Sequence, residues 1–182
     1  EAVEQATAVM GVSETTVNQM LERAEGVPAS LVELRRRVAR GEPISTAPVS
    51  MREIVVDRVA RLTSVQRRLL FVIALFGRPT PKEIAGRAAH LPDGAVGDAV
   101  HTLASEGLVE SGADGFIGMD EATRRSALDI AGPSTRSFLS GWIADELSSR
   151  ATPPAELAGF FAAAGQARPA FEQSRLAAFA AL

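Results

Sequence analysis

Few of the residue types that carry chemistry occur in this chain. Its 182 residues include no cysteine and two histidines, His90 and His101. Without cysteine the chain has no disulfides, thiolate nucleophiles or cysteine-ligated zinc. The histidines are too far apart for the H-E-x-x-H spacing that brings two metal ligands onto one helix face. We therefore expect no metal site, and we place both histidines at the surface or at helix ends.

The motifs of nucleotide hydrolysis and acyl transfer are also missing. No G-x-x-x-x-G-K-[ST] phosphate-binding loop occurs, and the sole lysine, Lys82, lies in Pro-Thr-Pro-Lys-Glu. No G-x-S-x-G nucleophile elbow occurs either. The many carboxylates fall on helix faces that we expect to be exposed. The sequence thus predicts that this segment is not an enzyme, has no catalytic residue and holds no cofactor of its own.

Charge and hydropathy narrow the setting. A net charge of −3 and a pI near 5.5 argue against a phosphate-binding surface over the whole molecule. No apolar run approaches the roughly 20 residues that span a bilayer, and the acidic start at residues 1–10 does not resemble a signal peptide. We expect a cytoplasmic protein with no membrane contact. Because the chain begins without Met, we expect a fragment of a longer one.

The first part of the chain, residues 1–45, predicts a small helical domain. Ser13 begins a helix that ends before Gly26, and Pro28 begins a second helix that ends at Gly41. Their expected apolar faces carry Val17, Met20 and Leu21, then Leu31, Val32, Leu34 and Val38. Arginines crowd the last turns of the second helix, which favours a solvated helix C-terminus. Residues 41–50 have the composition of a linker.

Residues 50–120 predict a winged helix-turn-helix. Ser50 and Ser64 are expected to cap two helices, the second of which is apolar almost all round and is the expected core. Thr80-Pro81 predicts the capped start of a short helix. A further helix, 93–106, precedes two short strands, 108–110 and 116–117, around a Gly-rich turn. Three helices and a β-hairpin follow one another in the winged-helix order.

Residues 121–182 predict helical hairpins that begin a repeat region. Gly132-Pro133 separates a first helix from a second, which starts at Ser134. Pro154 and Pro169 open two more, joined at Gly165. The second helix is expected to face inward with Phe138, Leu139, Trp142, Ile143 and Leu147. The predicted fold is mostly α, a winged helix-turn-helix with a small β-hairpin flanked by helical segments. The apolar end at Leu182 suggests a packing partner beyond it.

The would-be recognition helix is poorly equipped to read DNA. A recognition helix offers Arg, Lys, Asn or Gln to bases and phosphates. Helix 93–106 has no Arg or Lys, and its expected exposed positions include Asp93, Asp98 and Glu106. His101 is its sole candidate cation, and the wing tip offers Asp114. We therefore expect no direct DNA binding by this segment.

Basic residues gather elsewhere, and two interpretations remain open for them. They occur at 35–40, at 58, 61, 67 and 68, and at 124 and 125. Solvated helix faces opposite apolar stripes explain them most simply. The alternative is a docking surface for an acidic partner or a nucleotide-bearing domain.

Several segments together resemble one family. Residues 21–31, Leu-Glu-Arg-Ala-Glu-Gly-Val-Pro-Ala-Ser-Leu, resemble the G-x-P segment of STAND-class signal-transduction ATPases, the large LuxR-type and related actinobacterial regulators. Residues 55–77 and 103–109 are similar to the winged-helix domain of that class, and 124–128 and 154–158 to the start of its helical repeats. The resemblance implies that Gly26 and Pro28 contact the nucleotide. A plain turn between two helices explains the same two residues.

The resemblance also implies partners, and the sequence departs from the family pattern at one position. An upstream ATPase domain that binds ATP or ADP and downstream helical repeats would belong to the same chain. That family often has a phosphate-sensing histidine at the end of the wing, where this sequence has Asp120 or Glu121. A carboxylate would repel phosphate. Two functions other than the one that the resemblance implies stay open. One is a DNA-binding winged-helix regulator with a helical dimerisation tail, and the other is a protein-interaction adaptor with no link to nucleotide.

Overall fold

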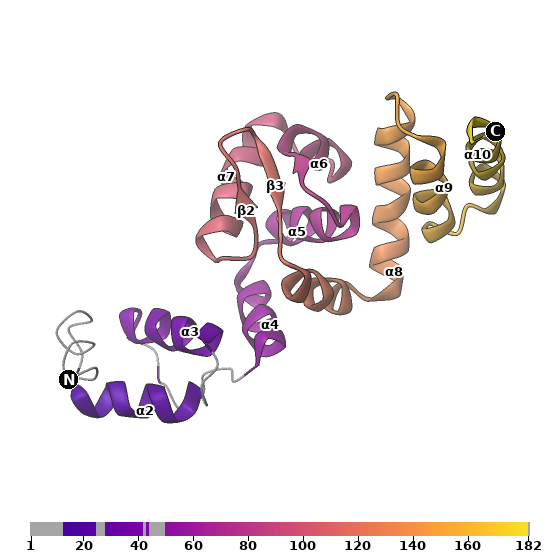
Figure 1. Ribbon diagram of the computed structural model, residues 1–182. Helices are drawn as coiled ribbons and strands as arrows, with labels where there is room; N and C mark the ends of the chain where they lie inside the picture. Colours follow the sequence, from indigo (N-terminus) through magenta and orange to yellow (C-terminus); the bar gives the residue numbers. More distant parts are fainter. Residues whose placement is uncertain (1–12, 25–27, 42, 44–49, 182) are drawn as a thin grey trace. The chain divides into compact units, whose positions relative to one another are not determined.

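The computed structural model describes residues 13–24, 28–41, 43 and 50–181. Over these residues the chain forms nine helices and a small three-stranded antiparallel sheet (Figure 1). The predicted fold class, a mostly helical chain around a winged helix-turn-helix with a β-hairpin, is confirmed. The chain divides into two compact units, Glu1–Asp57 and Arg58–Leu182. The division into 1–45, 50–120 and 121–182 stays a prediction.

The first unit contains α2 (Glu14–Ala24) and α3 (Pro28–Ala39). Ser13 begins α2 as predicted, since its Oγ accepts a hydrogen bond from the Thr16 backbone N–H at 3.2 Å. Met20 and Leu34 are buried at the centre of this helix pair, with Leu31 and Val38 packed against them. The predicted apolar faces are wider than the buried faces, because Leu21 and Val32 are exposed. Contact between two short helices covers a narrower stripe than the sequence pattern suggests.

Helix α4 (Met51–Arg61) begins as predicted. The Ser50 hydroxyl accepts from the Glu53 backbone N–H at 3.2 Å, and the Glu53 carboxylate accepts from the Ser50 N–H at 3.3 Å. This reciprocal pair is a capping box, which satisfies two backbone donors at the helix end. The predicted inward residues of this segment are all buried: Ile54, Val55, Val59 and Leu62.

Helix α5 (Ser64–Phe76) is the core of the second unit, as predicted. Its cap is Thr63 and not Ser64: Thr63 has extended backbone angles, and it forms a capping box with Gln66. The helix then buries Leu69, Leu70, Phe71, Val72, Ile73, Ala74 and Phe76. Gly77 ends it with φ +64°, a left-handed conformation that glycine adopts without a Cβ penalty.

The winged helix contains one strand that the sequence pattern does not predict. Strand β1 (Thr80–Pro81) pairs with β3 (Phe116–Gly118), which pairs in turn with β2 (Glu110–Ser111). The expectation that Thr80-Pro81 caps a helix is wrong, because Thr80 lies opposite Ile117 in the sheet. Its hydroxyl donates to the Arg78 carbonyl at 3.0 Å. Helices α6 (Lys82–Ala88) and α7 (Asp93–Ser105) follow.

The last part of the second unit is a long helix that packs on the core, followed by a hairpin of two helices. Helix α8 (Glu121–Ser148) is interrupted at Gly132, where φ is 70° and ψ 168°, so two segments exist as predicted. Helices α9 (Pro154–Ala163) and α10 (Ala167–Ala180) lie side by side (Figure 1). The Phe76 and Phe160 rings meet edge to face at 5.7 Å, which joins α9 to the core helix. Helix α10 starts two residues before Pro169.

Two negative observations apply to the described residues. None of their helices is both long and apolar enough to cross a membrane. Nor does any set of three or more of their histidine, aspartate and glutamate side chains come close enough to hold a metal ion.

Candidate functional site

The two residues predicted to contact nucleotide fall at the edge of what the structure describes. Gly26 lies outside the described residues. Pro28 begins α3, the position at which proline suits a helix because its missing N–H would have no helical partner there. The placement of its side chain is likewise outside the described part. Both assignments therefore stay predictions.

Helix α7 presents an acidic and neutral outer face. Val96, Ala99, Val100 and Leu103 turn inward and are buried. The exposed positions of the helix are Asp93, Gly94, Gly97, Asp98, His101 and Ser105. The hydroxyls of this face bond to the helix's own backbone, Thr102 to the Asp98 carbonyl at 3.0 Å and Ser105 to the Thr102 carbonyl at 2.8 Å. The outer face therefore offers few groups that could read a base edge.

The one charged residue at the tip of the wing, Asp114, stabilises the turn of the wing itself. Asp114 Oδ1 accepts a hydrogen bond from the Phe116 backbone N–H at 3.1 Å, and Gly115 beside it has φ +81°. From 108 to 119 the sequence contains no Arg or Lys. Asp114 thus shapes the turn between β2 and β3, and the wing lacks the cations that contact phosphates.

Several arginines that were interpreted as solvated are instead structural. Arg37 is buried and pairs with Asp57 at 3.0 Å within the first unit. In the second unit the buried Arg58 donates to the Gly107 carbonyl at 3.3 Å, and Arg67 donates to the Leu62 carbonyl at 3.1 Å. The solvated interpretation is wrong for these residues. Arginine can bury its aliphatic stem and still bring its guanidinium to a carbonyl, which periodicity does not reveal.

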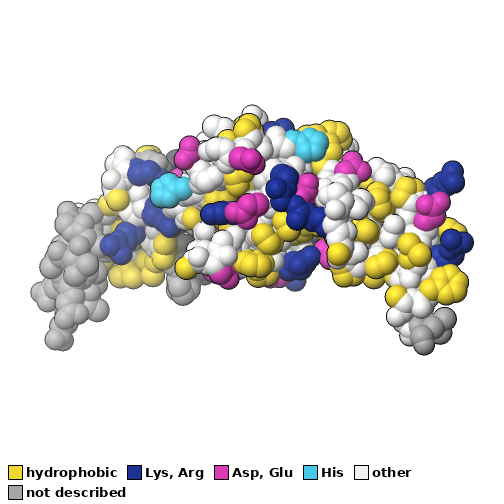
Figure 2. Space-filling view, turned by 90° about the horizontal axis from the view of Figure 1, so that it is seen from above, with side chains coloured by type: hydrophobic (Ala, Val, Ile, Leu, Met, Phe, Trp, Pro, Cys, Tyr) yellow, Lys and Arg dark blue, Asp and Glu magenta, His cyan; other side chains and the backbone are white. Residues whose placement is uncertain are grey.

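The charges that remain at the surface are mixed. On the face seen in Figure 2, Lys and Arg side chains alternate with Asp and Glu over the described residues and do not merge into one basic stripe. A continuous basic stripe is the electrostatic footprint that nucleic-acid binding leaves on a protein. This face lacks that footprint.

Two carboxylates occupy the end of the wing. Asp120 caps α8, its oxygens accepting from the Thr123 N–H at 2.9 Å and the Thr123 hydroxyl at 2.6 Å. Glu121 accepts from Arg124 at 2.7 Å and from Arg125 at 2.9 Å. The Arg124 hydrogen bond, with that of Arg125, lowers the pKa of Glu121 to about 2. This carboxylate is therefore charged at neutral pH and already bound to two arginines.

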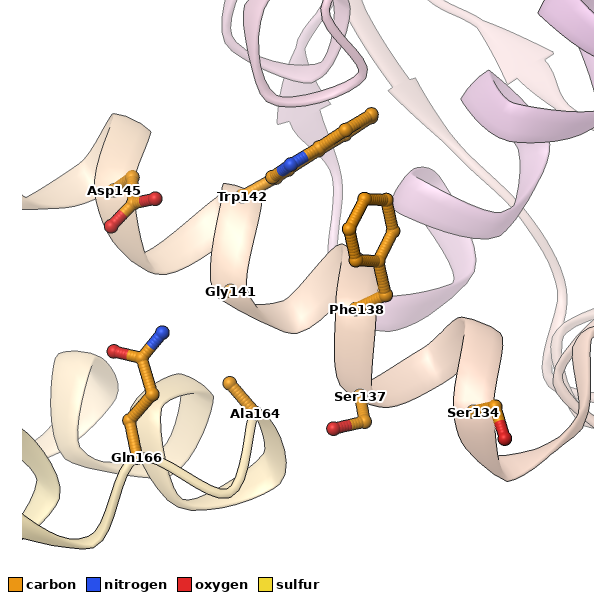
Figure 3. A pocket seen from close by; sticks show the side chains of 8 residues that line it. All are labelled: Ser134, Ser137, Phe138, Gly141, Trp142, Asp145, Ala164 and Gln166. Atoms are coloured by element: carbon orange, nitrogen blue, oxygen red, sulfur yellow. The ribbon is translucent and has the colours of Figure 1, made fainter.

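A groove lies between the second segment of α8 and the α9–α10 turn. It has a volume of about 510 Å³ and is lined by Ser134, Ser137, Phe138, Gly141, Trp142, Asp145, Ala164 and Gln166. Figure 3 shows the Asp145 and Gln166 side chains at the same end of this groove, while the Phe138 ring and the Trp142 indole point away from the α9–α10 turn. We call this hollow the α8 groove. The volume lies in the range of ligand sites.

An aromatic cluster borders the α8 groove. The His90 imidazole stacks on the Trp142 indole with centroids 3.8 Å apart, and Phe138 lies 4.7 Å from the same indole. The Arg68 guanidinium lies 5.6 Å from the Trp142 ring centroid. His90 is exposed at the end of α6, as predicted, and has φ +50°.

The sequence pattern does not predict the α8 groove, because that pattern assigns Phe138 to the interior. That assignment is wrong, since Phe138 is 60% exposed. Its apolar spacing along α8 matches that of the buried Leu139 and Ile143, so periodicity alone could not separate them. Nothing in the sequence around Gln166 indicates that this residue lines a groove.

No protein-family model, curated protein or solved structure matches this chain.

Proposed function

We propose that this chain is a non-catalytic regulatory and scaffolding segment of a STAND-type ATP-dependent signalling protein or transcription regulator. Its winged helix would transmit nucleotide state between an upstream ATPase domain and downstream helical repeats. The observation that carries the proposal is the outer face of α7. The part of a winged helix that normally enters the major groove here exposes Asp93 and Asp98 and no Arg or Lys.

Electrostatics supports a role other than DNA reading. Binding to a duplex gains free energy when cations replace counterions along the phosphates. Carboxylates at Asp93 and Asp98 add repulsion instead, and the hydroxyls of Thr102 and Ser105 already bond to the helix backbone. The wing, shaped by Asp114, adds no compensating cation.

The way the winged helix joins the helical hairpin supports a scaffolding role. Arg87 of α6 pairs with Glu146 of α8 at 3.0 Å, and Arg78, which precedes β1, pairs with Glu156 of α9. Helix α8 packs against both α5 and α9 (Figure 1). A displacement at the winged helix would therefore move the hairpin with it, because the two share a core and not a flexible linker.

DNA binding tests the first half of the proposal. We expect the 182-residue chain to show no tight binding to duplex DNA at low salt by fluorescence polarisation. The double variant D93K/D98K should gain salt-dependent affinity, because it restores cations to the outer face of α7. Tight, salt-sensitive binding by the unchanged chain would instead establish the DNA-binding regulator.

Nucleotide affinity tests the second half. In the complete protein that carries this segment, we expect Pro28→Ala to weaken ATP or ADP binding by about tenfold, the loss expected when an apolar contact of this size is removed. Val32→Ala is the matched control, since Val32 is exposed on the same helix. Equal affinity of the two variants would remove nucleotide from the proposal and leave a protein-interaction adaptor.

A further inference from the structure

We propose that the α8 groove binds a cationic group on an alkyl chain, a guanidinium or an ammonium. The groove combines one carboxylate, one exposed aromatic ring and several neutral hydrogen-bonding groups. This inference is independent of the proposed function, because it concerns the side of α8 and not the winged helix.

The charge of the groove selects for a cation. Asp145 is the one charged residue among those that line it, and no Arg or Lys does so. Within the described residues Asp145 has no ion-pair or hydrogen-bond partner. The adjacent Glu146 differs, because Arg87 and Arg150 both donate to its carboxylate. Asp145 is thus the carboxylate of this pair that can accept from a ligand.

The aromatic wall suits the alkyl chain and the cation together. Phe138 is 60% exposed and stands beside Trp142, whose own ring is stacked by His90. An exposed aromatic face attracts a cation electrostatically and covers a methylene chain. Of the two rings, Phe138 is the one that is mostly exposed, and Trp142 packs beside it.

The remaining lining groups fit a polar head that carries several N–H donors. Gln166 contributes an amide, and Ser134 and Ser137 contribute hydroxyls, all of which can accept hydrogen bonds. Gly141 keeps the bottom of the groove open, since a Cβ there would lie 3.6 Å from the Gln166 amide nitrogen and 3.8 Å from Ala164 Cβ. Those are ordinary contact distances. Alanine at 141 should therefore fold normally and narrow the groove.

The experiment uses Trp142, the only tryptophan of the 182 residues, as the reporter. Its fluorescence is followed while butylguanidinium, butylammonium or a blocked peptide with a single arginine is added at fixed pH and ionic strength. Backbone amide shifts at Gly141, Asp145 and Gln166, followed by NMR, provide a second measurement. Asp145→Asn removes the charge at constant shape, and Asp129→Asn removes an exposed carboxylate of α8 that does not line the groove.

We expect saturable changes with the unchanged chain and with D129N. Affinity should fall about tenfold in D145N, the scale of a lost charged hydrogen bond, and it should also fall in G141A. Tighter binding of the peptide than of butylguanidinium would identify a protein segment as the source of the cation, and equal binding a free small molecule. Equal titration of D145N and the unchanged chain, or no saturable change in either measurement, would overturn the proposal.

Discussion

Helices α5 and α10 are both rich in apolar residues and have opposite surroundings. Helix α5 is buried along most of its length and is packed against α6, α7, α8 and β3. Helix α10 buries Ala170 alone of its residues, while Phe171 is 68% and Phe179 67% exposed. The apolar content of a helix measures how much surface could be covered. Whether it is covered depends on how many neighbours surround the helix.

The two helices also differ in how well their ends are capped. Thr63 and Gln66 close the start of α5 with a capping box, and Gly77 closes its end. Gln166, which precedes the first residue of α10, forms no side-chain cap. Local sequence and tertiary packing therefore agree for α5, and consistency of this kind is typical of the part of a protein that specifies the fold.

The largest expected effect comes from removing core volume in α5. Ile73→Ala should lower the free energy of unfolding by about 2–5 kcal/mol, because Ile73 is fully buried and the cavity adds to the lost transfer energy. Leu176→Ala on α10 removes a similar side chain from an exposed position and should cost much less. Urea denaturation monitored by far-UV circular dichroism measures both. Equal losses would break the comparison between the two helices.

Sequence patterns predicted the regular elements better than their contacts. The capped starts at Ser13 and Ser50, the break at Gly132-Pro133 and the glycine that ends α5 follow from local chemistry and are confirmed. Strand β1 was missed, because two residues that end in proline carry no strand pattern and pair only when β3 comes alongside. Such pairing is tertiary information.

Side-chain surroundings were the least predictable part. Phe138 and Leu139 are adjacent and similar in hydrophobicity, yet Leu139 is buried and Phe138 forms a wall of the α8 groove. Arg37 and Arg58 were grouped with solvated arginines, although both are buried. In each case the outcome depends on which distant segment packs nearby. Composition could exclude cysteine chemistry but could not locate a groove.

The capping box gives the next largest effect. Thr63→Ala should lower the free energy of unfolding by about 1 kcal/mol, because it leaves the Gln66 backbone N–H without its side-chain acceptor. Gln166→Ala, at the corresponding position of α10, should have almost no effect, since no cap is lost. Chemical denaturation of the two variants compares the helix starts directly. A greater loss for Gln166→Ala would reverse the ranking.

The Glu121 network gives a smaller effect that depends on pH. The folded pKa of about 2 lies below the ordinary value of 4.5, so the contribution of Glu121 to stability is fully present above about pH 4.5 and is lost as the pH falls toward 2. Glu121→Gln should therefore flatten the dependence of Tm on pH in that window. Arg124→Ala should raise the Glu121 pKa more than Arg125→Ala, because Arg124 is the larger cause. NMR titration of the carboxyl group measures both shifts.

The smallest effect on stability is expected on the exposed face of α10. Phe171→Ser removes a ring that is already in water, so the free energy of unfolding should change by less than about 0.5 kcal/mol. Phe161→Ser, on the buried side of α9, should cost several times more, because it places a hydroxyl among apolar neighbours. A large loss for Phe171→Ser would mean that the face of α10 is covered in solution. Sedimentation over a range of protein concentrations would then decide whether a second copy covers it, because a self-associating face makes the effect of the substitution depend on concentration.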